Sequence, residues 1–490
     1  MRERTEQGRW MWGVGAVVVG LSASTLAAQE LPELPADAAA GTGEVRQCAM
    51  GPMGEGLRCG VFRVWEDRDA AEGRTLDLHF VVVEATDTAE RTNDAVLMFT
   101  GGPGVPTIGG APGIAQGLAG LNRSRDIVLV DLRGIGGPDA LGCDVPYPDG
   151  FESRFGSIFD SAHLAACRDT LSTRADLTLY TTPISVDDLE ELRRWLGYDA
   201  VNLLGGSYGS RVAQVYMRRY PDAVRTAVLT GVTAVSEPGY VNTSRNLQNA
   251  LELVIRECAQ QAACNAAYPD LETLMEEAFA HFDDGPVAVE LDGRTVPFHA
   301  ADLGYALRGL LYNRSAEVPY RIDQAARGEF RELAEYYVQR TDWVSSGEGT
   351  AAGNHFSVIC AEDIGPVTDE DVRRAAAGTF LRGHVILSYR AACAVWPEAD
   401  LPADFFDPVR SDAPTLLISG ERDPVTPPAG AERVAAGLTQ HMHVIIPNGG
   451  HGSISPCVVR MVTTLIEDGT LENVDPSCVS EAPPTEFRLP

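Results

Sequence analysis

The chain has 490 residues and a formal net charge of −30, from 69 acidic and 39 basic side chains. A surface of that sign repels a phosphate backbone, so we expect no nucleic-acid partner. With 44% hydrophobic and 22% charged residues, the composition is globular, and the length suits a large core with a second domain or a sizeable insertion.

The amino terminus has the three parts of a secretory signal peptide. Three arginines precede an uncharged run from Trp10 to Leu21, and small residues follow through Ala28. We therefore predict that residues 1–28 are an export signal. The mature chain would then be periplasmic or secreted, with no stable membrane association. The alternative is an uncleaved anchor, because the charge-free stretch is barely long enough to span a bilayer.

Ten cysteines lie beyond the predicted signal, and no two of them have the close spacing of metal ligands. An even number of cysteines in an exported chain predicts disulfides and an oxidising compartment. Pairing between neighbours in sequence is the simplest arrangement, although the sequence alone does not determine the connectivity.

Strand and helix patterns alternate over residues 61–230, after a segment rich in Pro, Ala and Gly at 29–43 that we interpret as a tether. Short apolar runs of this kind are typical of strands buried on both faces of a parallel sheet. The predicted strands are 61–65, 76–83, 95–100, 127–130, 200–204 and 227–230, and the predicted helices are 186–196 and the segment from Ser207 through 219.

The pattern changes to mostly helical over residues 236–411, and strands resume at 415–419 and 443–446. The helices predicted in this block are 247–258, 271–282, 302–312 and 320–339. We predict an α/β fold with a mostly parallel sheet flanked by helices. Its core would be built from residues 29–235 and 412–490, with residues 236–411 inserted as a mainly helical cap.

Residues 205–209 contain the pattern Gly-x-Ser-x-Gly, which is typical of a nucleophile elbow. A predicted strand precedes Ser207 and a predicted helix follows it, so the turn is sharp and its neighbouring side chains must be small. The turn places the hydroxyl at a helix N-terminus, where N–H groups can stabilise an oxyanion. We predict that Ser207 is a catalytic nucleophile; the alternative is a glycine-rich structural turn.

A serine nucleophile needs a base, and the base needs an orienting carboxylate. In folds with this elbow the chain order is serine, acid, histidine. Asp423 and His451 each follow a predicted strand near the carboxyl end of the chain, at the sheet edge where active sites gather. We predict that they complete a triad; a turn-capping aspartate and a surface-loop histidine are the structural alternatives. The rivals nearest in sequence are Glu421, His441 and His443.

The oxyanion hole should combine the N–H of Tyr208 with an N–H from the glycine-rich loop at 101–104, which follows an early predicted strand. Pro103 has no N–H, so Gly102 is the predicted second donor. A phosphate cradle is the competing interpretation of such glycines, but the loop lacks both the Lys-Ser/Thr ending of a P-loop and the spacing of a dinucleotide fingerprint.

Spaced motifs over most of the mature chain resemble the serine peptidases of the proline iminopeptidase and tripeptidyl aminopeptidase group, which have the α/β-hydrolase fold. The resemblance implies removal of residues from free peptide N-termini by a Ser-Asp-His triad, without a cofactor. The export signal and cysteines make the secreted tripeptidyl branch the more similar one. The motifs are 101–104 (GGPG), 131–136 (DLRGIG), 205–210 (GGSYGS), 423–427 (DPVTP) and 450–452 (GHG).

An aminopeptidase must hold a substrate ammonium group, and Glu362 and Asp363 are the candidates that the resemblance offers. The alternative for this pair is a solvated or helix-capping role. An esterase or lactonase with the same triad is the nearest rival function, and a catalytically silent binding protein is the second. The residue preference and the oligomeric state stay open at this point.

Overall fold

The computed structural model describes residues 31–49, 57–110, 120–145, 147, 149–344, 349–481 and 484–490. The predicted export signal lies outside these residues. Among the helices of the described part, none is long and apolar enough to cross a membrane.

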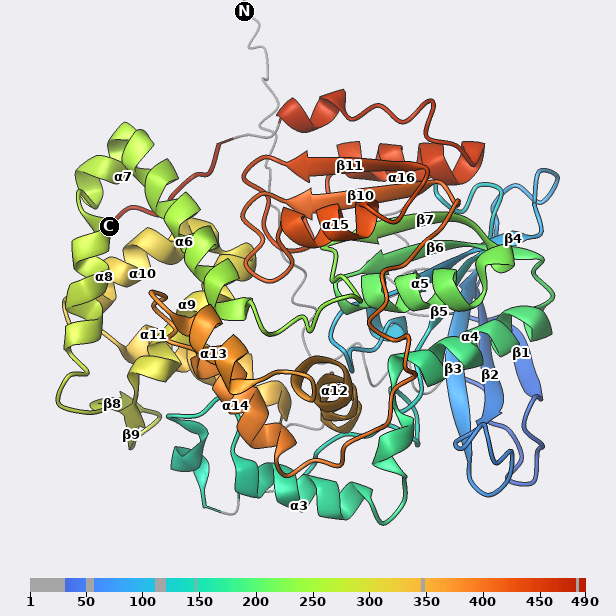
Figure 1. Cartoon of the computed structure of the whole chain (residues 1–490), viewed down its shortest axis with the longest axis horizontal. Helices are drawn as coiled ribbons and strands as arrows, with labels where there is room; N and C mark the ends of the chain where they lie inside the picture. The colour runs from blue at the N-terminus through green and yellow to red at the C-terminus, as the bar shows by residue number, and fades with distance from the viewer. Residues whose placement is uncertain are drawn as a thin grey trace, which may run out of the picture.

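A nine-stranded sheet forms the centre of the fold, in the order β1-β2-β3-β5-β4-β6-β7-β10-β11 (Figure 1). The first three strands pair antiparallel, β3 pairs antiparallel with β5, and the remaining neighbours are parallel. The strands are β1 (Gly43–Cys48), β2 (Leu57–Trp65), β3 (Thr75–Val83), β4 (Asp94–Phe99), β5 (Ile127–Val130), β6 (Ala200–Gly206), β7 (Val224–Thr230), β10 (Thr415–Gly420) and β11 (His441–Ile446).

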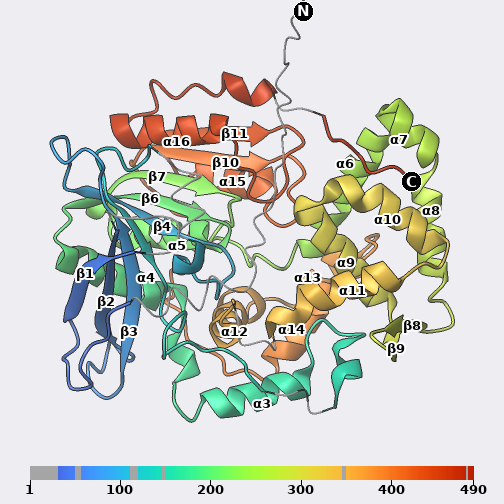
Figure 2. The same ribbon diagram turned by 180° about the vertical axis from the view of Figure 1, so that it is seen from behind.

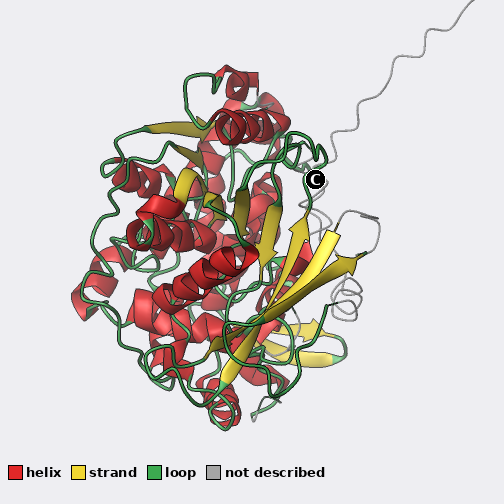
Figure 3. Ribbon diagram, turned by 90° about the vertical axis from the view of Figure 1, so that its right-hand side faces the viewer, coloured by secondary structure: helices red, strands yellow, loops and turns green. Residues whose placement is uncertain are grey.

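Both faces of the sheet are buried, which explains the continuous apolar runs of strands such as β5. One face packs on helices α4 (Thr182–Leu196), α5 (Tyr208–Arg219) and α15 (Pro428–Ala435). The opposite face packs on α16 (Pro456–Asp468). Figure 3 shows the twisted strands with helices around them. The predicted fold class, a mostly parallel sheet flanked by helices, is confirmed.

The described part of the predicted tether, from residue 31 on, is hydrogen-bonded to the core. The Arg63 guanidinium of β2 donates hydrogen bonds to the carbonyls of Pro35, Ala36 and Ala38, at 2.8–3.3 Å. The backbone of Arg63 also pairs with Thr42 and Gly41. A composition rich in Pro and Ala gives no hint of such contacts, which come from a buried arginine distant in sequence.

Between β7 and β10 the chain forms mainly helices, which lie beside the sheet in Figures 1 and 2. Before β6, the α-helix α3 (Ser161–Leu171) lies below this block in Figure 1. The block contains α6 (Thr243–Gln260), α7 (Ala262–Ala267), α8 (Leu271–Ala280), the hairpin β8 (Val287–Leu291) and β9 (Arg294–Phe298), α9 (Ala300–Asn313), α10 (Val318–Ala326), α11 (Arg331–Thr341), α12 (Ala352–Ile359), α13 (Asp369–Ala376) and α14 (His384–Cys393).

The prediction of a single helix over 320–339 is wrong, because this segment forms two helices. The chain forms α10 and α11 with a break between Arg327 and Phe330. Gly328 lies in this break with φ +79°, a left-handed conformation that glycine adopts without strain and that ends a helix. The apolar periodicity continues across the break, so it did not reveal the turn.

All ten cysteines are within the described residues, and they form five disulfides, each between two cysteines that follow one another in the order of the chain. The simplest predicted pairing is therefore confirmed. The pairs are Cys48–Cys59, Cys143–Cys167, Cys258–Cys264, Cys360–Cys393 and Cys457–Cys478.

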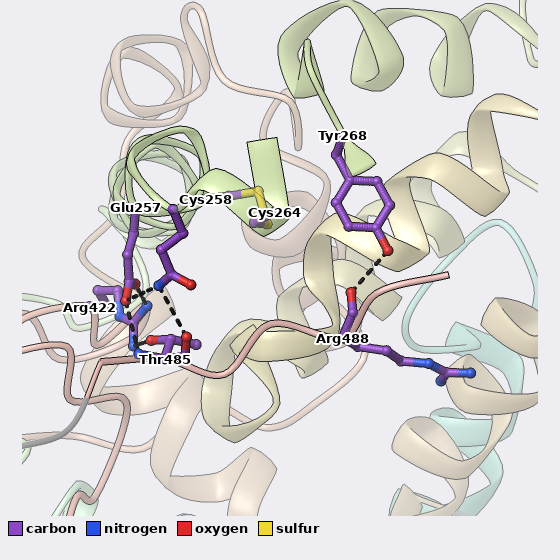
Figure 4. The surroundings of a disulfide bond; sticks show 8 residues. Glu257, Cys258, Cys264, Tyr268, Arg422, Thr485 and Arg488 are labelled. Carbon is purple, nitrogen blue, oxygen red and sulfur yellow. Dashed lines mark hydrogen bonds and ion pairs between the residues drawn. A yellow bond between two sulfur atoms is a disulfide. The ribbon is translucent and has the colours of Figure 1, made fainter. Parts of the chain in front are cut away.

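The carboxyl-terminal tail returns to the helical block beside the disulfide of α6 and α7 (Figure 4). The Thr485 N–H donates to Glu257 at 3.1 Å, and the Tyr268 hydroxyl donates to the carbonyl of Arg488 at 2.9 Å. Arg422 forms an ion pair with Glu257 and donates to the Thr485 hydroxyl at 2.9 Å. The tail thus ties α6 to the loop that follows β10.

Candidate active site

Ser207 lies between the end of β6 and the start of α5, with φ 56° and ψ −122°. This is a strained conformation for a residue with a side chain, of the kind that functional sites retain. Two positions before and after Ser207 the turn has room only for glycine: a Cβ on Gly205 would lie 2.3 Å from the Gly209 carbonyl oxygen, and one on Gly209 would lie 2.4 Å from that of Phe99. The predicted elbow is therefore present in the structure.

Asp423 and His451 come together from the loops that follow β10 and β11. The His451 Nδ1 lies 2.8 Å from Asp423 Oδ2, so the ring N–H can donate to the carboxylate. Thr426 supports the pair: its hydroxyl donates to Asp423 Oδ2 at 2.7 Å and lies 3.0 Å from His451 Nδ1. Sequence reasoning quoted Thr426 within a motif but gave it no role.

The Asp423 carboxylate is buried, yet its surroundings favour the charged form. Burial alone would raise its pKa, but the adjacent His451 ring and the hydrogen bonds from Thr426 hold the pKa below its ordinary value. The N–H groups of Val425 and Thr426 each donate to the other oxygen, Oδ1, at 2.9 Å. An ionised, fixed carboxylate is the group that can orient an imidazole.

The rival residues have other partners. Glu421 accepts the N–H of Asn448 at 2.9 Å, and the His443 ring lies 3.0 Å from the Ser419 hydroxyl. The His441 Nδ1 bonds the carbonyl of Leu438 at 3.0 Å. Thus, of the polar groups weighed at this end of the chain, the structure pairs only Asp423 and His451 with each other.

Ser207 and His451 flank the end of β7. The Ser207 N–H donates to the Thr230 carbonyl at 2.9 Å, and a Cβ on the next residue, Gly231, would lie 3.3 Å from His451 Cε1. Among the described residues the Ser207 hydroxyl has no hydrogen-bond partner. Catalytic hydrogen bonds are often long without substrate and tighten in the substrate complex, so the arrangement is compatible with proton transfer.

The glycine-rich loop after β4 approaches the serine closely. A Cβ on Gly101 would lie 3.3 Å from Ser207 Oγ, and Gly102 and Tyr208 line one pocket with Ser207. The N–H groups of Gly102 and Tyr208 donate to no residue in the described part of the chain. Two free donors beside the serine oxygen are what an oxyanion hole requires.

A buried polar network lies beneath Tyr208. Its hydroxyl is 2.7 Å from the Thr182 hydroxyl, which bonds Glu362 at 2.8 Å. Arg211 contacts Glu362 at 3.3 Å and holds Asp363 with two hydrogen bonds, at 2.7 and 2.9 Å. Neither Thr182 nor Arg211 carried a signal in the sequence, since their acidic partners are more than 150 residues away.

The two candidate ammonium ligands therefore have different environments. Glu362 is fully buried, and burial raises its pKa to about 7. It does not line the pocket beside Ser207. Asp363 does line that pocket, which holds about 800 Å³ of empty space, part of it open to solvent. A solvated role for the pair is excluded by this burial.

Asp131 anchors the loop that carries Gly102. Its Oδ1 accepts the N–H groups of Thr107 at 2.7 Å and Ile108 at 3.0 Å, but burial outweighs these bonds and raises its pKa to about 7. The folded chain therefore keeps a proton that the unfolded chain releases between the ordinary value of 3.8 and about 7. The free energy of unfolding should fall as the pH rises through this window.

We expect Asp131→Asn to flatten this pH dependence, because the amide keeps an acceptor oxygen but does not ionise. Each tenfold difference in proton affinity corresponds to about 1.4 kcal/mol. The measurement is thermal unfolding from pH 4 to 8, with the exposed Asp199→Asn as control. A slope as steep in Asp131→Asn as in the wild type would contradict this assignment.

Comparisons with known proteins agree with this geometry. Residues 94–266 match the family described as the alpha/beta hydrolase fold, and residues 379–478 match the family described as TAP-like protein. Serine protease Hip1 of Mycobacterium tuberculosis is 24% identical over 85% of this chain and 86% of its own length. Tripeptidyl aminopeptidase of Streptomyces lividans is 23% identical over 87% of this chain and 84% of its own length.

Among solved structures, MGS-M2, an alpha/beta hydrolase from a deep-sea metagenome library, has a TM-score of 0.38 and 16% identity. The match covers 80% of this chain and 94% of that one. The sheet order, the elbow and the family matches together define an α/β hydrolase. Its carboxyl-terminal part is in addition similar to the TAP-like family, which agrees with the resemblance that its motifs suggested.

Proposed function

We propose that the protein is an exported serine aminopeptidase that hydrolyses peptide bonds near free N-termini, of the prolyl or tripeptidyl type. The observation that carries this proposal is the hydrogen-bonded pair of Asp423 and His451 beside the elbow of Ser207. The names of the similar proteins, a serine protease and a tripeptidyl aminopeptidase, favour a peptide over other acyl substrates.

The proposed reaction is acyl transfer. Ser207 Oγ attacks the substrate carbonyl while His451 accepts the hydroxyl proton, and the N–H groups of Gly102 and Tyr208 bind the oxyanion. The C–N bond then breaks and His451 returns the proton to the leaving amine. Water activated by the same imidazole hydrolyses the acyl-enzyme. Asp423 keeps the imidazole in the tautomer that exposes Nε2 and stabilises the imidazolium.

The proposed binding of a free N-terminus uses the pocket beside Ser207. The carboxylate of Asp363 lines this pocket and is fixed by Arg211, so it can accept a substrate ammonium without moving. Glu362 would not contact the substrate. It would hold the Thr182 hydroxyl, which in turn hydrogen-bonds to the hydroxyl of Tyr208. We propose that residues 236–411 act as a cap that limits how many residues enter.

Export is supported by the signal-like residues 1–28 and by five disulfides, which persist in oxidising compartments. We propose that the mature chain is located in the periplasm or is secreted, and that it acts there on peptides.

The test compares three substrates of matched sequence: a tripeptidyl arylamide with a free amine, its N-acetylated form, and a short acyl ester. We expect kcat/KM for the free amine to exceed that of the acetylated form by at least about 100-fold, because acetylation removes the charge that Asp363 would bind. Equal rates on the two arylamides would contradict aminopeptidase action. Turnover of the ester alone would favour the esterase or lactonase alternative.

A further inference from the structure

Arg308 of α9 is a buried cation that pairs with no carboxylate in the described part of the chain. Its side chain is almost fully enclosed, with 6% of its surface exposed. Within the described residues its one hydrogen bond goes from Nη2 to the Tyr312 hydroxyl, at 2.8 Å, and Nε is buried without a partner. The guanidinium lies over the rings of Tyr305 and Tyr312, 5.1 and 4.9 Å from their centroids.

This isolation contrasts with the other fully buried arginines of the chain. Arg133 donates to both oxygens of Asp188, at 2.7 and 2.9 Å, and Arg211 holds Asp363 in the same way. Placing a charge in a protein interior is costly unless it is paired, and contact with aromatic faces offsets only part of that cost. In a chain with 69 acidic residues, an unpaired buried guanidinium is an exception that needs a reason.

The carboxylates nearest to this region have other partners. Asp363 is bound to Arg211, and Asp423 is bound to His451 and Thr426. A second cation, Arg340 of α11, lies 5.8 Å from the Tyr312 ring. Arg340 also forms no ion pair within the described part of the chain. Arg308 and Arg340 thus both contact the Tyr312 ring without an ion-pair partner in the described part of the chain, so their N–H groups are available to an anion.

Arg308 also lies next to the proposed active site. The carbonyl of Tyr312 accepts a hydrogen bond from the backbone N–H of His451 at 3.1 Å, and the centroids of the two side-chain rings are 5.2 Å apart. On the other side, Tyr240 lines the pocket that contains Ser207. Burial raises the pKa of the Tyr240 hydroxyl, and the charge of Arg308 opposes that rise. Tyr312 thus lies between the Arg308 guanidinium, 4.9 Å from its ring centroid, and the imidazole of His451.

We propose that Arg308 binds a carboxylate of the substrate, so that the enzyme prefers peptides with an acidic group near the scissile bond. The inference rests on the proposed peptidase function. A guanidinium matches the planar geometry of a carboxylate and is the usual residue for such pairs. The carboxylate is either an Asp or Glu side chain or the carboxyl terminus of a short peptide, and these two sources have the same chemistry.

Two series of short peptides with free N-termini test the proposal. One series carries Glu or Gln at each position beside the scissile bond, and the other ends in a free acid or an amide. We expect the wild type to favour the acid over its neutral partner by at least about tenfold in kcat/KM in one series, which identifies the source of the carboxylate. Arg308→Gln should bring that ratio close to one, and Arg308→Lys should restore part of it.

The control is Arg331→Gln, which removes an exposed arginine paired with Glu335 in α11 and should keep the wild-type ratio. Circular dichroism and thermal unfolding check that each variant folds. Calorimetric binding of the same acid and amide peptides to Ser207→Ala separates the two hypotheses. No hydrolysis of any peptide by the wild type would overturn the proposed function, while tighter binding of the acids would still support the anion site. The role of Arg308 would be overturned if wild type and Arg308→Gln showed the same ratio of kcat/KM between acidic and neutral peptides. Equal binding of the acidic and the neutral peptides to Ser207→Ala would overturn it as well.

Discussion

Replacing Ser207 with alanine is expected to lower kcat/KM on a peptide substrate by at least about 10⁴-fold, because the acyl-enzyme cannot form. The variant should fold, since alanine is smaller and the hydroxyl makes no hydrogen bond with the described residues. A fluorophosphonate probe should label the wild type at residue 207 and leave Ser207→Ala unlabelled. Intact-protein mass spectrometry and steady-state kinetics measure both effects.

The matched control is Ser172→Ala, a change at an exposed serine that ends α3, far from the site in sequence. It should keep wild-type labelling and turnover. Labelling of Ser207→Ala at the wild-type rate would contradict the assignment of the nucleophile. Absence of labelling and turnover in the wild type would instead favour the catalytically silent protein.

Asp423→Asn should lower kcat by about 10³- to 10⁴-fold with little change in structure. The carboxylate accepts the N–H of His451 Nδ1, which leaves Nε2 free to take the proton of Ser207. An amide group can donate to Nδ1 instead, which favours the wrong tautomer, and it lacks the charge that stabilises the imidazolium. Single-turnover kinetics with an activated ester isolate the acylation step that this change should slow.

Glu421→Gln is the control for this prediction, because Glu421 is two residues away and its carboxylate holds the Asn448 N–H rather than the imidazole. Glutamine keeps an acceptor for that N–H, so we expect less than about a threefold change in kcat. A larger loss in Glu421→Gln than in Asp423→Asn would refute the choice of acid.

Local sequence patterns were sufficient to predict the sheet and the elbow. Buried strands appear in the sequence as short apolar runs. The glycines at 205 and 209 are required by contacts within a few ångströms of the turn. The order of serine, acid and histidine then placed Asp423 and His451 in loops at the correct edge of the sheet. These features depend on neighbours in sequence or on the order of strands, both of which the chain displays directly.

The supporting residues depend on contacts that no local pattern encodes. Thr182 meets Glu362 across 180 positions, and Arg422 joins the loop after β10 to α6 and to the carboxyl-terminal tail. Arg308 lies in the apolar second half of α9, and its sequence neighbours do not show that it has no carboxylate partner among the described residues. Gly328 separates α10 from α11 through its left-handed conformation, at φ +79°, a turn that the apolar periodicity over 320–339 does not show.

The most direct test of the central claim is to digest a library of peptides with free N-termini and to measure the product masses over time. We expect the wild type to release short fragments from the N-terminus, Ser207→Ala to release none, and N-acetylated copies to stay uncleaved. Cleavage at internal positions, or equal activity in Ser207→Ala, would contradict the claim.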